Sequence, residues 1–391
     1  MKYNFDKYVD RKNTNASKID NLKALFGRDD IIPLWVADMD FEVAEPIIKA
    51  GQNVLDRKVF GYSERPSEYY ESYKKWQKKR NNFDIDTSLM SHEAGVVPAM
   101  QATVEALTEP GDGVVIQPPI YPPFFKTSES IDRVIYTNEL VQNENGTYEI
   151  DFEDFEEKIS REDVKLFVIC NPHNPTGNAW SREDLEKMGN ICLKHNVTVL
   201  SDEIHSDLMV FGNKHVPTAS ISDEIKANTI TYLSPTKTFN LAGIQTSIIL
   251  FNNMENKNKF DELAMKNSKG RTNCFAIDMC IAAFEEGEEW LEQLLLYIEG
   301  NMKFVVNYIE ENIPELKVYL PEATYLLWID FRNLGLSEDE LRDLLINEAK
   351  IGLNDGVPYG KPGIGFQRLN VATSRAVLEE AMKRLEKAIR K

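Results

Sequence analysis

Residues 166–177 read LFVICNPHNPTG, an apolar run that turns abruptly into a polar, proline-rich segment. The run at 166–170 is rich in β-branched and aromatic residues, which predicts a buried strand. Two Asn-Pro steps follow, and a residue before proline favours extended backbone, so the polar segment is expected to be a stiff loop. This stretch therefore predicts a rigid polar loop at the carboxyl end of a buried strand.

Four further strands are predicted around this one, between about residues 94 and 251. Short β-branched runs alternate there with helical patterns, which is typical of a parallel sheet built from βαβ units. We expect these strands at 114–117, 197–201, 229–233 and 246–251. A capped helix is expected to open at Ser181. Ligands bind at the carboxyl ends of strands in such sheets, so we expect one site where three polar segments meet: 171–177, 202–207 and 234–240.

The pattern of predicted strands and helices changes after about residue 288. We expect a long acidic helix, strands at 316–320 and 325–331, a helix opened by a Ser337/Glu340 capping box, and a final helix from about 374. A chain of 391 residues also exceeds what one compact core usually holds. We therefore predict a large α/β domain at 46–288 and a smaller α+β domain formed by 1–45 and 289–391.

Composition limits the partners and the compartment. The formal charge of −18 is scattered along the chain, and such a surface disfavours nucleic-acid and membrane partners. The first residues are too polar for a signal peptide, no segment approaches a membrane-spanning length, and a cytoplasmic location follows as the default. The four cysteines form no CxxC pair and the histidines no HExxH motif, so no metal site is expected.

Three side chains at the strand ends suggest a common chemistry. Lys237, in SPTKTFN, can form an imine while Ser234 and Thr236 bind part of a phosphate. Asp202 follows a buried strand, where a carboxylate needs a positive partner such as a protonated pyridine nitrogen. Asn174 can present its amide to a ligand oxygen from the stiff loop. Each residue by itself also has a simpler interpretation: Lys237 as a solvated loop lysine, Asp202 as a helix N-cap and Asn174 as part of an ordinary turn.

Further candidates are weaker by themselves. His205 lies three residues after Asp202 and could reach the same ligand oxygen, although a lone histidine is more often structural. Gly95–Met100 opens a helix, and its amides at Ala99 and Met100 would bind a phosphate dianion. Tyr121, in a proline-rich loop, could stack on an aromatic ligand or simply pack beneath the loop.

Together and in this order, these motifs resemble the fold-type I enzymes that depend on pyridoxal 5′-phosphate (PLP), in the class I/II aminotransferase superfamily. The resemblance implies the three-layer PLP-transferase fold, an α/β architecture with a mostly parallel central sheet plus the smaller α+β domain. Within the superfamily, LWVADMDF (34–41), GVVPAM (95–100), SDEIHSDL (201–208) and KTFNLAG (237–243) look like the cystathionine β-lyase (C-S lyase) branch, which includes the maltose-regulon modulator type. Aspartate-type aminotransferases usually have tyrosine where this chain has His205.

The resemblance also implies a role for each residue. Lys237 would hold PLP as a Schiff base and act as the catalytic residue, with Asp202 at the ring nitrogen, Asn174 and His205 at the phenolic oxygen and Tyr121 over the ring. The phosphate would lie at Ala99, Met100, Ser234, Thr236 and, from a neighbouring subunit of a homodimer, Tyr62. Arg368 would bind the substrate α-carboxylate as a bidentate pair, with Asn174 and Ala37 beside the substrate.

One position departs from the aminotransferase pattern. Many of these enzymes place an arginine eight residues after the Schiff-base lysine, where it neutralises the phosphate, and this chain has Gln245 there. Helix amides and hydroxyls must then meet most of the phosphate charge, and Arg271 is a candidate to compensate.

The expected reaction is an α,β-elimination that cleaves cystathionine or a related S-substituted cysteine into a thiol, pyruvate and ammonia. An aminotransferase shares every step up to loss of the Cα proton, so cofactor motifs do not separate the two. A non-enzymatic regulator on the same fold is the third possibility. Such a protein could dispense with Lys237 or Asp202, whereas this chain keeps both. The preferred substrate cannot be read from the motifs.

Overall fold

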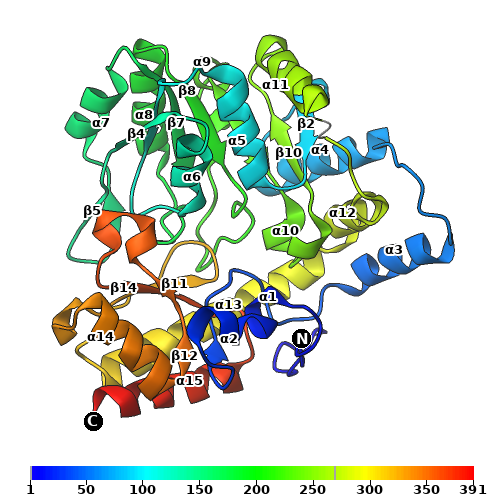
Figure 1. Cartoon of the computed structure of the whole chain (residues 1–391). Coiled ribbons are helices and arrows are strands. Elements are labelled where there is room, and N and C mark those ends of the chain that lie inside the picture. The colour runs from blue at the N-terminus through cyan, green and yellow to red at the C-terminus, as the bar shows by residue number, and fades with distance from the viewer. Residues whose placement is uncertain (1, 268–269) are drawn as a thin grey trace.

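A seven-stranded sheet forms the centre of the computed structural model, which describes residues 2–267 and 270–391 (Figure 1). Its strands, in spatial order, are β2 (Met90–Glu93), β10 (Ser247–Leu250), β9 (Thr229–Leu233), β8 (Thr198–Asp202), β7 (Val164–Cys170), β3 (Gly113–Ile116) and β4 (Val134–Thr137). All five predicted strands of this region are present. The predicted mostly parallel sheet is confirmed.

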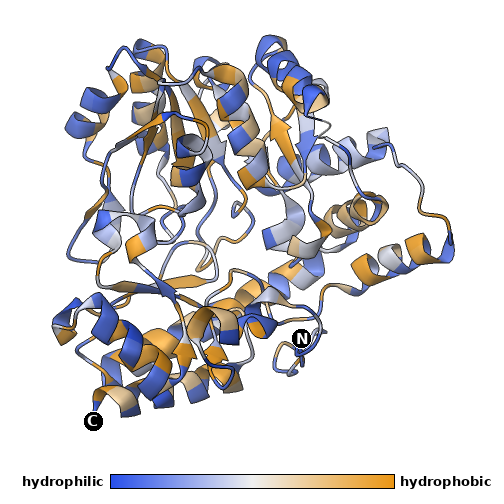
Figure 2. Ribbon diagram, in the orientation of Figure 1, coloured by the Kyte–Doolittle hydropathy of each residue, from blue (hydrophilic) through white to orange (hydrophobic). Residues whose placement is uncertain are grey.

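The sheet is the middle of three layers because its strands alternate between two buried faces. Leu166, Val168 and Cys170 of β7 pack in one apolar cluster with residues of α5 (Val96–Leu107) and α11 (Met254–Lys266). The intervening Phe167 and Ile169 pack in a second cluster with α7 (Phe152–Ile159) and α8 (Arg182–Lys194). Hydrophobic colour accordingly gathers on the central strands, whereas the flanking helices are striped (Figure 2). Burial on both faces explains the continuous apolar runs.

Strand β10 is the exception to the parallel arrangement, since it runs antiparallel to both β9 and β2. The connection from β9 to β10 contains only the short α10 (Pro235–Thr238) and a 3₁₀ turn at Ala242–Ile244. No crossover helix intervenes there, in contrast to the connection through α8 between the parallel strands β7 and β8. The predicted cap of α8 is confirmed, because Ser181 Oγ accepts the Asp184 N–H at 3.0 Å.

A second, antiparallel sheet lies in the C-terminal part, with the order β11 (Leu326–Asp330), β14 (Phe366–Asn370) and β13 (Asn354–Asp355). Strand β11 and the Ser337/Glu340 capping box of α14 (Glu338–Asp343) confirm the sequence prediction. The expected strand at 316–320 is wrong. Only Lys317 forms an isolated bridge, with Asp330, because the rest of that run lies beside no strand edge. Strand β14 was not predicted, since its polar residues conceal that all five positions are buried.

The remaining helices surround these sheets. The long acidic helix is α13 (Glu288–Asn312) and the final helix is α15 (Arg375–Ile389), both as predicted. The others are α1 (Ser17–Asp20), α2 (Leu22–Phe26), α3 (Glu45–Asp56), α4 (Ser67–Asn81), α6 (Pro123–Glu129), α9 (Asp223–Lys226), α12 (Cys274–Glu286) and a π-helical turn at Leu344–Ala349. No helix in the described part of the chain has the length and apolar character needed to cross a bilayer.

The N-terminal segment packs on the C-terminal part of the chain. Strand β1 (Ile32–Pro33) pairs in parallel with β12 (Ile351–Gly352), and Leu34 N–H donates to Gly352 O at 2.9 Å. A separate hairpin is formed by β5 (Val141–Gln142) and β6 (Tyr148–Glu149). These contacts place residues 32–34 on the C-terminal part of the chain, as expected from the sequence. The domain limits at 46 and 289 stay predictions.

Candidate active site

Lys237 extends from a single helical turn that begins where β9 ends. Ser234 caps this turn, since its Oγ accepts the Thr236 N–H at 3.1 Å, and Pro235 occupies the first helical position, where its missing N–H is harmless. Ser234 Oγ also donates to Thr246 O at 2.6 Å, which ties the turn to the approach of β10. The Lys237 ammonium donates to the carbonyl oxygen of Ala37 at 2.6 Å.

The environment of Lys237 favours its neutral, nucleophilic form. Burial and, to a smaller extent, the positive charge of Arg368 lower the pKa of this amine to about 8, although Asp38 and Asp202 act in the opposite direction. A lysine that is partly neutral near neutral pH can both form an imine and accept a proton. The expected roles of Lys237 remain predictions, and this environment suits them.

Asp202 is the last residue of β8 and its carboxyl group is buried. Burial raises the pKa of this carboxyl to about 7, although the Ile204 N–H donates to its Oδ1 at 3.1 Å and opposes the shift. Residues 204–207 form turns, so Asp202 caps no helix. The simpler reading of this residue as a helix N-cap is therefore excluded.

Asn174, in the loop after β7, contacts Arg368, in β14 of the second sheet. Arg368, in β14, donates from Nη1 to Asn174 Oδ1 at 3.0 Å and from Nη2 to Trp35 O at 3.1 Å. The stiff loop that carries Asn174 begins after β7, and Asn171 N–H donates to Asp202 O at 2.9 Å. This loop therefore links the end of β7 to that of β8 and to the second sheet.

His205 is buried close to these groups. Burial lowers the pKa of its imidazole to about 3, and the positive charges of Lys237 and Arg368 add to the effect, so the ring is neutral at physiological pH. Its ring centroid lies 6.2 Å from that of Tyr325, whose hydroxyl donates to Ala37 O at 2.9 Å. A neutral histidine can donate to a ligand oxygen without adding charge.

The predicted phosphate amides need a correction. Helix α5 begins at Val96, so Ala99 is its fourth residue, and the Ala99 N–H already donates to Gly95 O at 3.0 Å. The expectation of a free amide at Ala99 is therefore wrong, and Met100 lies one residue deeper in the helix. The first amides of the helix, those of Val96 and Val97, are the ones that lack an intrahelical acceptor. The prediction placed the helix start too close to Pro98.

Tyr121 lies beyond β3, with its ring edge-on to Phe124 at 5.8 Å between centroids. Burial raises the pKa of its hydroxyl, and the charge of Asp202 is among the smaller influences. Tyr62 lies elsewhere: its side chain is 93% exposed, and the Arg271 guanidinium lies 4.8 Å from its ring centroid. Among the described residues, neither Tyr62 nor Arg271 forms a hydrogen bond or ion pair with Lys237, Ser234 or Thr236.

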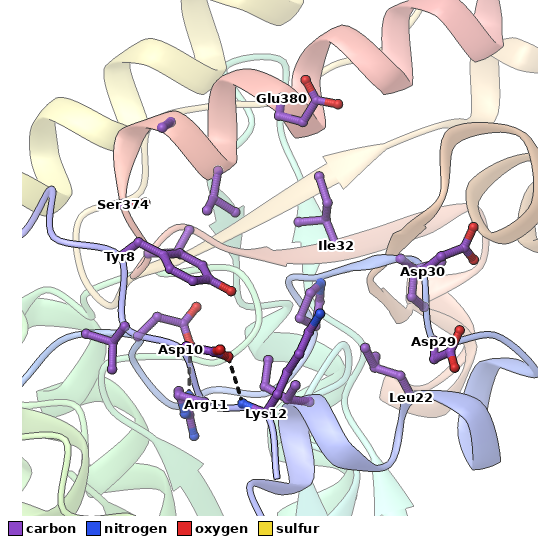
Figure 3. A pocket seen from close by; sticks show the side chains of 18 of the residues that line it. Tyr8, Asp10, Arg11, Lys12, Leu22, Asp29, Asp30, Ile32, Ser374 and Glu380 are labelled. Atoms are coloured by element: carbon purple, nitrogen blue, oxygen red, sulfur yellow. Dashed lines mark hydrogen bonds and ion pairs between the residues drawn. The ribbon is translucent and has the colours of Figure 1, made fainter. Parts of the chain in front are cut away.

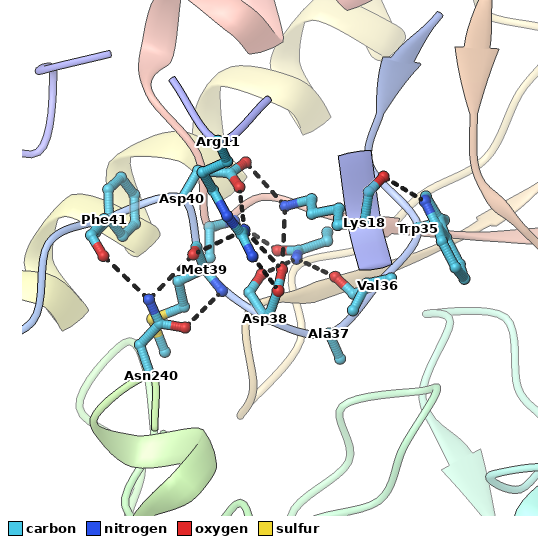
Figure 4. Close-up of polar contacts among 12 residues, drawn as sticks. Arg11, Lys18, Trp35, Val36, Ala37, Asp38, Met39, Asp40, Phe41 and Asn240 are labelled. Atoms are coloured by element: carbon cyan, nitrogen blue, oxygen red, sulfur yellow. Dashed lines mark hydrogen bonds and ion pairs between the residues drawn. The ribbon is translucent and has the colours of Figure 1, made fainter. Parts of the chain in front are cut away.

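The segment 35–41 is the part of the site that sequence analysis described least. Asn370 Nδ2 donates to both Val36 O and Asp38 O at 2.6 Å, and Asn240 forms three hydrogen bonds with Met39 and Phe41 (Figure 4). Asn240 lies three residues after Lys237 and has a positive φ of 57°, which asparagine tolerates better than most residues. The only sequence signal for these asparagines is their position: Asn240 follows Lys237 by three residues, and Asn370 follows Arg368 by two.

Comparison with known families identifies the group to which this site belongs. The family model described as aminotransferase class I and II matches residues 29–385. The chain belongs to this family. The match includes every predicted site residue, from Ala37 to Arg368.

Individual members of the aminotransferase class I and II family are similar over the whole length. Cystathionine beta-lyase PatB of Bacillus subtilis is 42% identical, with 99% of this chain and 100% of that protein covered. The PLP-bound structure of a putative aminotransferase from Clostridium difficile is 44% identical with a TM-score of 0.97, covering 99% of this chain and 100% of the other. Cystalysin from Treponema denticola, whose structure contains PLP, is 35% identical with a TM-score of 0.97, covering 100% and 99%.

Unpaired polar atoms test whether PLP suits this family member. His205 Nδ1 and Arg368 Nε are buried and have no hydrogen-bond partner among the described residues. A raised carboxyl pKa at Asp202 is also what a buried acid shows before a cation approaches it. A ligand with a cationic ring nitrogen and a ring oxygen would give partners to Asp202 and His205, its aldehyde would react with Lys237, and Arg368 Nε would be left for a substrate carboxylate. The residues present therefore fit PLP.

Proposed function

We propose that this protein is a PLP-dependent carbon-sulfur β-lyase, which cleaves cystathionine or related S-substituted cysteines into a thiol, pyruvate and ammonia. The observation that carries the proposal is 42% identity to a cystathionine beta-lyase over 99% of the chain. The local environment agrees, because a buried lysine with a pKa near 8, a buried acid and a buried arginine are neighbours. A cytoplasmic location remains the expectation from the sequence.

The site residues would divide the binding of PLP among them. Lys237 would hold PLP, Asp202 would pair with the ring nitrogen, and His205 with Asn174 would bind the ring oxygen. Ser234 and Thr236 would bind the phosphate together with the first amides of α5. When bound, PLP supplies an electron sink for the charge that develops at Cα.

The regions around residues 46 and 289 would mark the limits between a large and a small domain.

The chain's own groups account for the order of events. Arg368 would bind the substrate α-carboxylate, which fixes the substrate amine and Cα beside Lys237. The Lys237 amine would then remove the Cα proton, and the Cβ–S bond would break with its electron pair leaving on sulfur. The thiolate takes a proton as it departs. The released aminoacrylate hydrolyses to pyruvate and ammonia, which consumes one water.

A homodimer belongs to the same proposal. Tyr62 is almost fully exposed, and it lies in a stretch with two further exposed apolar side chains, Val59 and Phe60. Exposed apolar groups of this kind are typical of an interaction surface. We propose that Tyr62 contacts the phosphate in a second copy of the chain. Arg271, beside Tyr62, is then placed to offset the missing arginine at Gln245.

Aminotransferase activity is the second candidate, because the similar Clostridium difficile structure is described as a putative aminotransferase. Purified holoenzyme should be incubated with L-cystathionine and no keto acid, and pyruvate and free thiol measured. Stoichiometric release over many turnovers supports the lyase. Turnover that requires a keto acid would overturn it in favour of transamination.

Lys237→Ala is the matched control for this assay. It should lose the visible absorbance of the lysine-bound cofactor and reduce pyruvate release by about 10³-fold or more, since it removes both the imine and the base. Cofactor absorbance that survives the substitution unchanged would instead favour a non-enzymatic regulator on the same fold.

A further inference from the structure

Four charged side chains at segment 35–41 form a network that we call the N-terminal ion cluster: Arg11, Lys18, Asp38 and Asp40 (Figure 4). Arg11 bridges both acids, with Nη2 to Asp38 Oδ2 at 2.6 Å and Nη1 to Asp40 Oδ1 at 2.8 Å. Lys18 Nζ lies 2.8 Å from Asp40 Oδ2 and 3.7 Å from Asp38 Oδ1. Two cations and two carboxylates thus form one closed, neutral network.

The cluster is more shielded from water than the protein's surface ion pairs. The Lys18 side chain is fully buried, and the side chains of Asp38 and Asp40 are 18% and 17% exposed. Buried charges need well-placed partners, because each one left alone costs several kcal/mol. The positions of the two acids, and with them the backbone of segment 35–41, are therefore tightly restrained by the cations.

Packing cannot supply this restraint on the outer side. A cavity of about 980 Å³ lies between the N-terminal residues and α15, and Arg11 and Asp40 are among the residues that line it (Figure 3). Tyr8 and Lys12 line the cavity from the N-terminal side, and Glu380 lines it from α15. On the face that borders this open space the ion pairs restrain Asp38 and Asp40, whereas Asn370 and Asn240 bind the backbone of the same segment elsewhere.

On the inner side, the same segment presents one carbonyl to the reacting lysine. Ala37 O accepts Lys237 Nζ at 2.6 Å and the Tyr325 hydroxyl at 2.9 Å. Ala37 is next to Asp38, so a movement of Asp38 alters the direction of that carbonyl. Asn370 also binds the neighbouring carbonyls of Val36 and Asp38, and it orients this stretch from β14.

We propose that Arg11 and Lys18 are positioning residues for Lys237. By holding Asp38 and Asp40, they aim the Ala37 carbonyl at the Lys237 amine and keep that amine directed at the reacting centre whenever it is not bound to the cofactor. The inference rests on the proposed function only in taking Lys237 as the reacting amine, a role that a lyase and an aminotransferase share.

The test compares Arg11→Gln with Arg28→Gln in the holoenzyme. Arg28 is a matched control, because it also forms a short ion pair in the N-terminal region, with Asp30 at 2.7 Å, but does not contact segment 35–41. After rapid mixing with L-cystathionine, Arg11→Gln should slow the absorbance change that follows release of Lys237 from the cofactor by about tenfold, as expected for a small misplacement of a reacting group. It should change KM by less than about threefold, and Arg28→Gln should change neither.

Hydrogen exchange gives a readout that does not depend on activity. In the Arg11→Gln holoenzyme, backbone amides in 36–41 should exchange about tenfold faster, with no change in Arg28→Gln, because restraint by the cluster is lost. Arg11→Lys should restore part of the rate, since it keeps one ion pair. If Arg11→Gln does not fold, Arg11→Lys against Arg28→Lys is the comparison to make.

Absorbance and exchange rates within twofold of the unaltered enzyme in a folded Arg11 variant would overturn the inference. Faster exchange with an unchanged absorbance rate would also overturn it, because the cluster would then be merely structural. If the unaltered enzyme releases no pyruvate while the Arg11 variants still slow the absorbance change, the proposed lyase function fails and the positioning role stands.

Discussion

Asp202 and the pair Asp38 and Asp40 are acidic groups around the same lysine, and the fold treats them in opposite ways. Asp38 and Asp40 each lie within 2.8 Å of a cation. Asp202 is buried, accepts the N–H of Ile204, and has its pKa raised to about 7 by burial. The comparison separates two proposed uses of charge: the paired acids would hold the backbone, and the buried acid at the strand end would pair with a cationic ligand.

The largest expected effect is on the paired side of this comparison. Lys18→Met should lower the free energy of unfolding by about 3–5 kcal/mol, because it leaves Asp40 with fewer positive partners in a shielded site. Denaturant unfolding followed by circular dichroism measures this. Arg28→Gln, at an exposed pair, should cost no more than about 1 kcal/mol. Equal losses in the two variants would show that the cluster is an ordinary surface network.

Asp202→Asn should instead affect the reaction. It should lower kcat by about 10²–10³-fold, the usual effect of removing one preorganised electrostatic group from an active site. The cofactor-free protein should not be destabilised, because the substitution removes a carboxylate that burial disfavours. Steady-state kinetics and unfolding of the cofactor-free protein provide the two measurements. A large loss of stability with little loss of kcat would reverse the assignment of the two regions.

A smaller effect is expected where the two sheets meet. Arg368→Lys should raise KM by about tenfold with a smaller change in kcat, because lysine cannot reproduce a planar two-point contact with a carboxylate. Arg332→Lys is the matched control, since Arg332 lies over Phe366 in the same sheet and pairs with Asp330. Kinetics with L-cystathionine decide the matter. An equal rise of KM in both variants would remove Arg368 from the substrate site.

The last prediction concerns the pH dependence of stability. The carboxyl pKa of Asp202 is higher in the folded protein, about 7, than its ordinary value of 3.8. The folded state therefore binds more protons in this range, and stability falls as pH rises from about 4 to 7, by at most about 1.4 kcal/mol per pH unit. Asp202→Asn should flatten this slope in the cofactor-free protein, measured by denaturant unfolding at several pH values. An unchanged slope would mean that Asp202 does not titrate there.

The elements that local patterns could predict are those of the central sheet. Strand β7 is an unbroken apolar run, and its alternate residues fill the two faces of the sheet, which a run of β-branched and aromatic residues indicates directly. Strand β14 was not predicted because three of its five residues are polar, although Gln367, Arg368 and Asn370 are all buried. Their burial depends on partners far away in the chain, which local patterns do not encode.

The sequence alone determined the order of the chemistry: Asn174, Asp202 and Lys237 each follow a strand, and a parallel sheet collects strand ends on one edge. Only the tertiary structure decided how the lysine is held. Arg368 reaches Trp35 across 333 positions, and Lys237 reaches Ala37 across 200. The physical reason is separation along the sequence. Strand and cap preferences depend on residues close together in the chain, whereas hydrogen bonds and ion pairs join whichever groups the folded chain brings together.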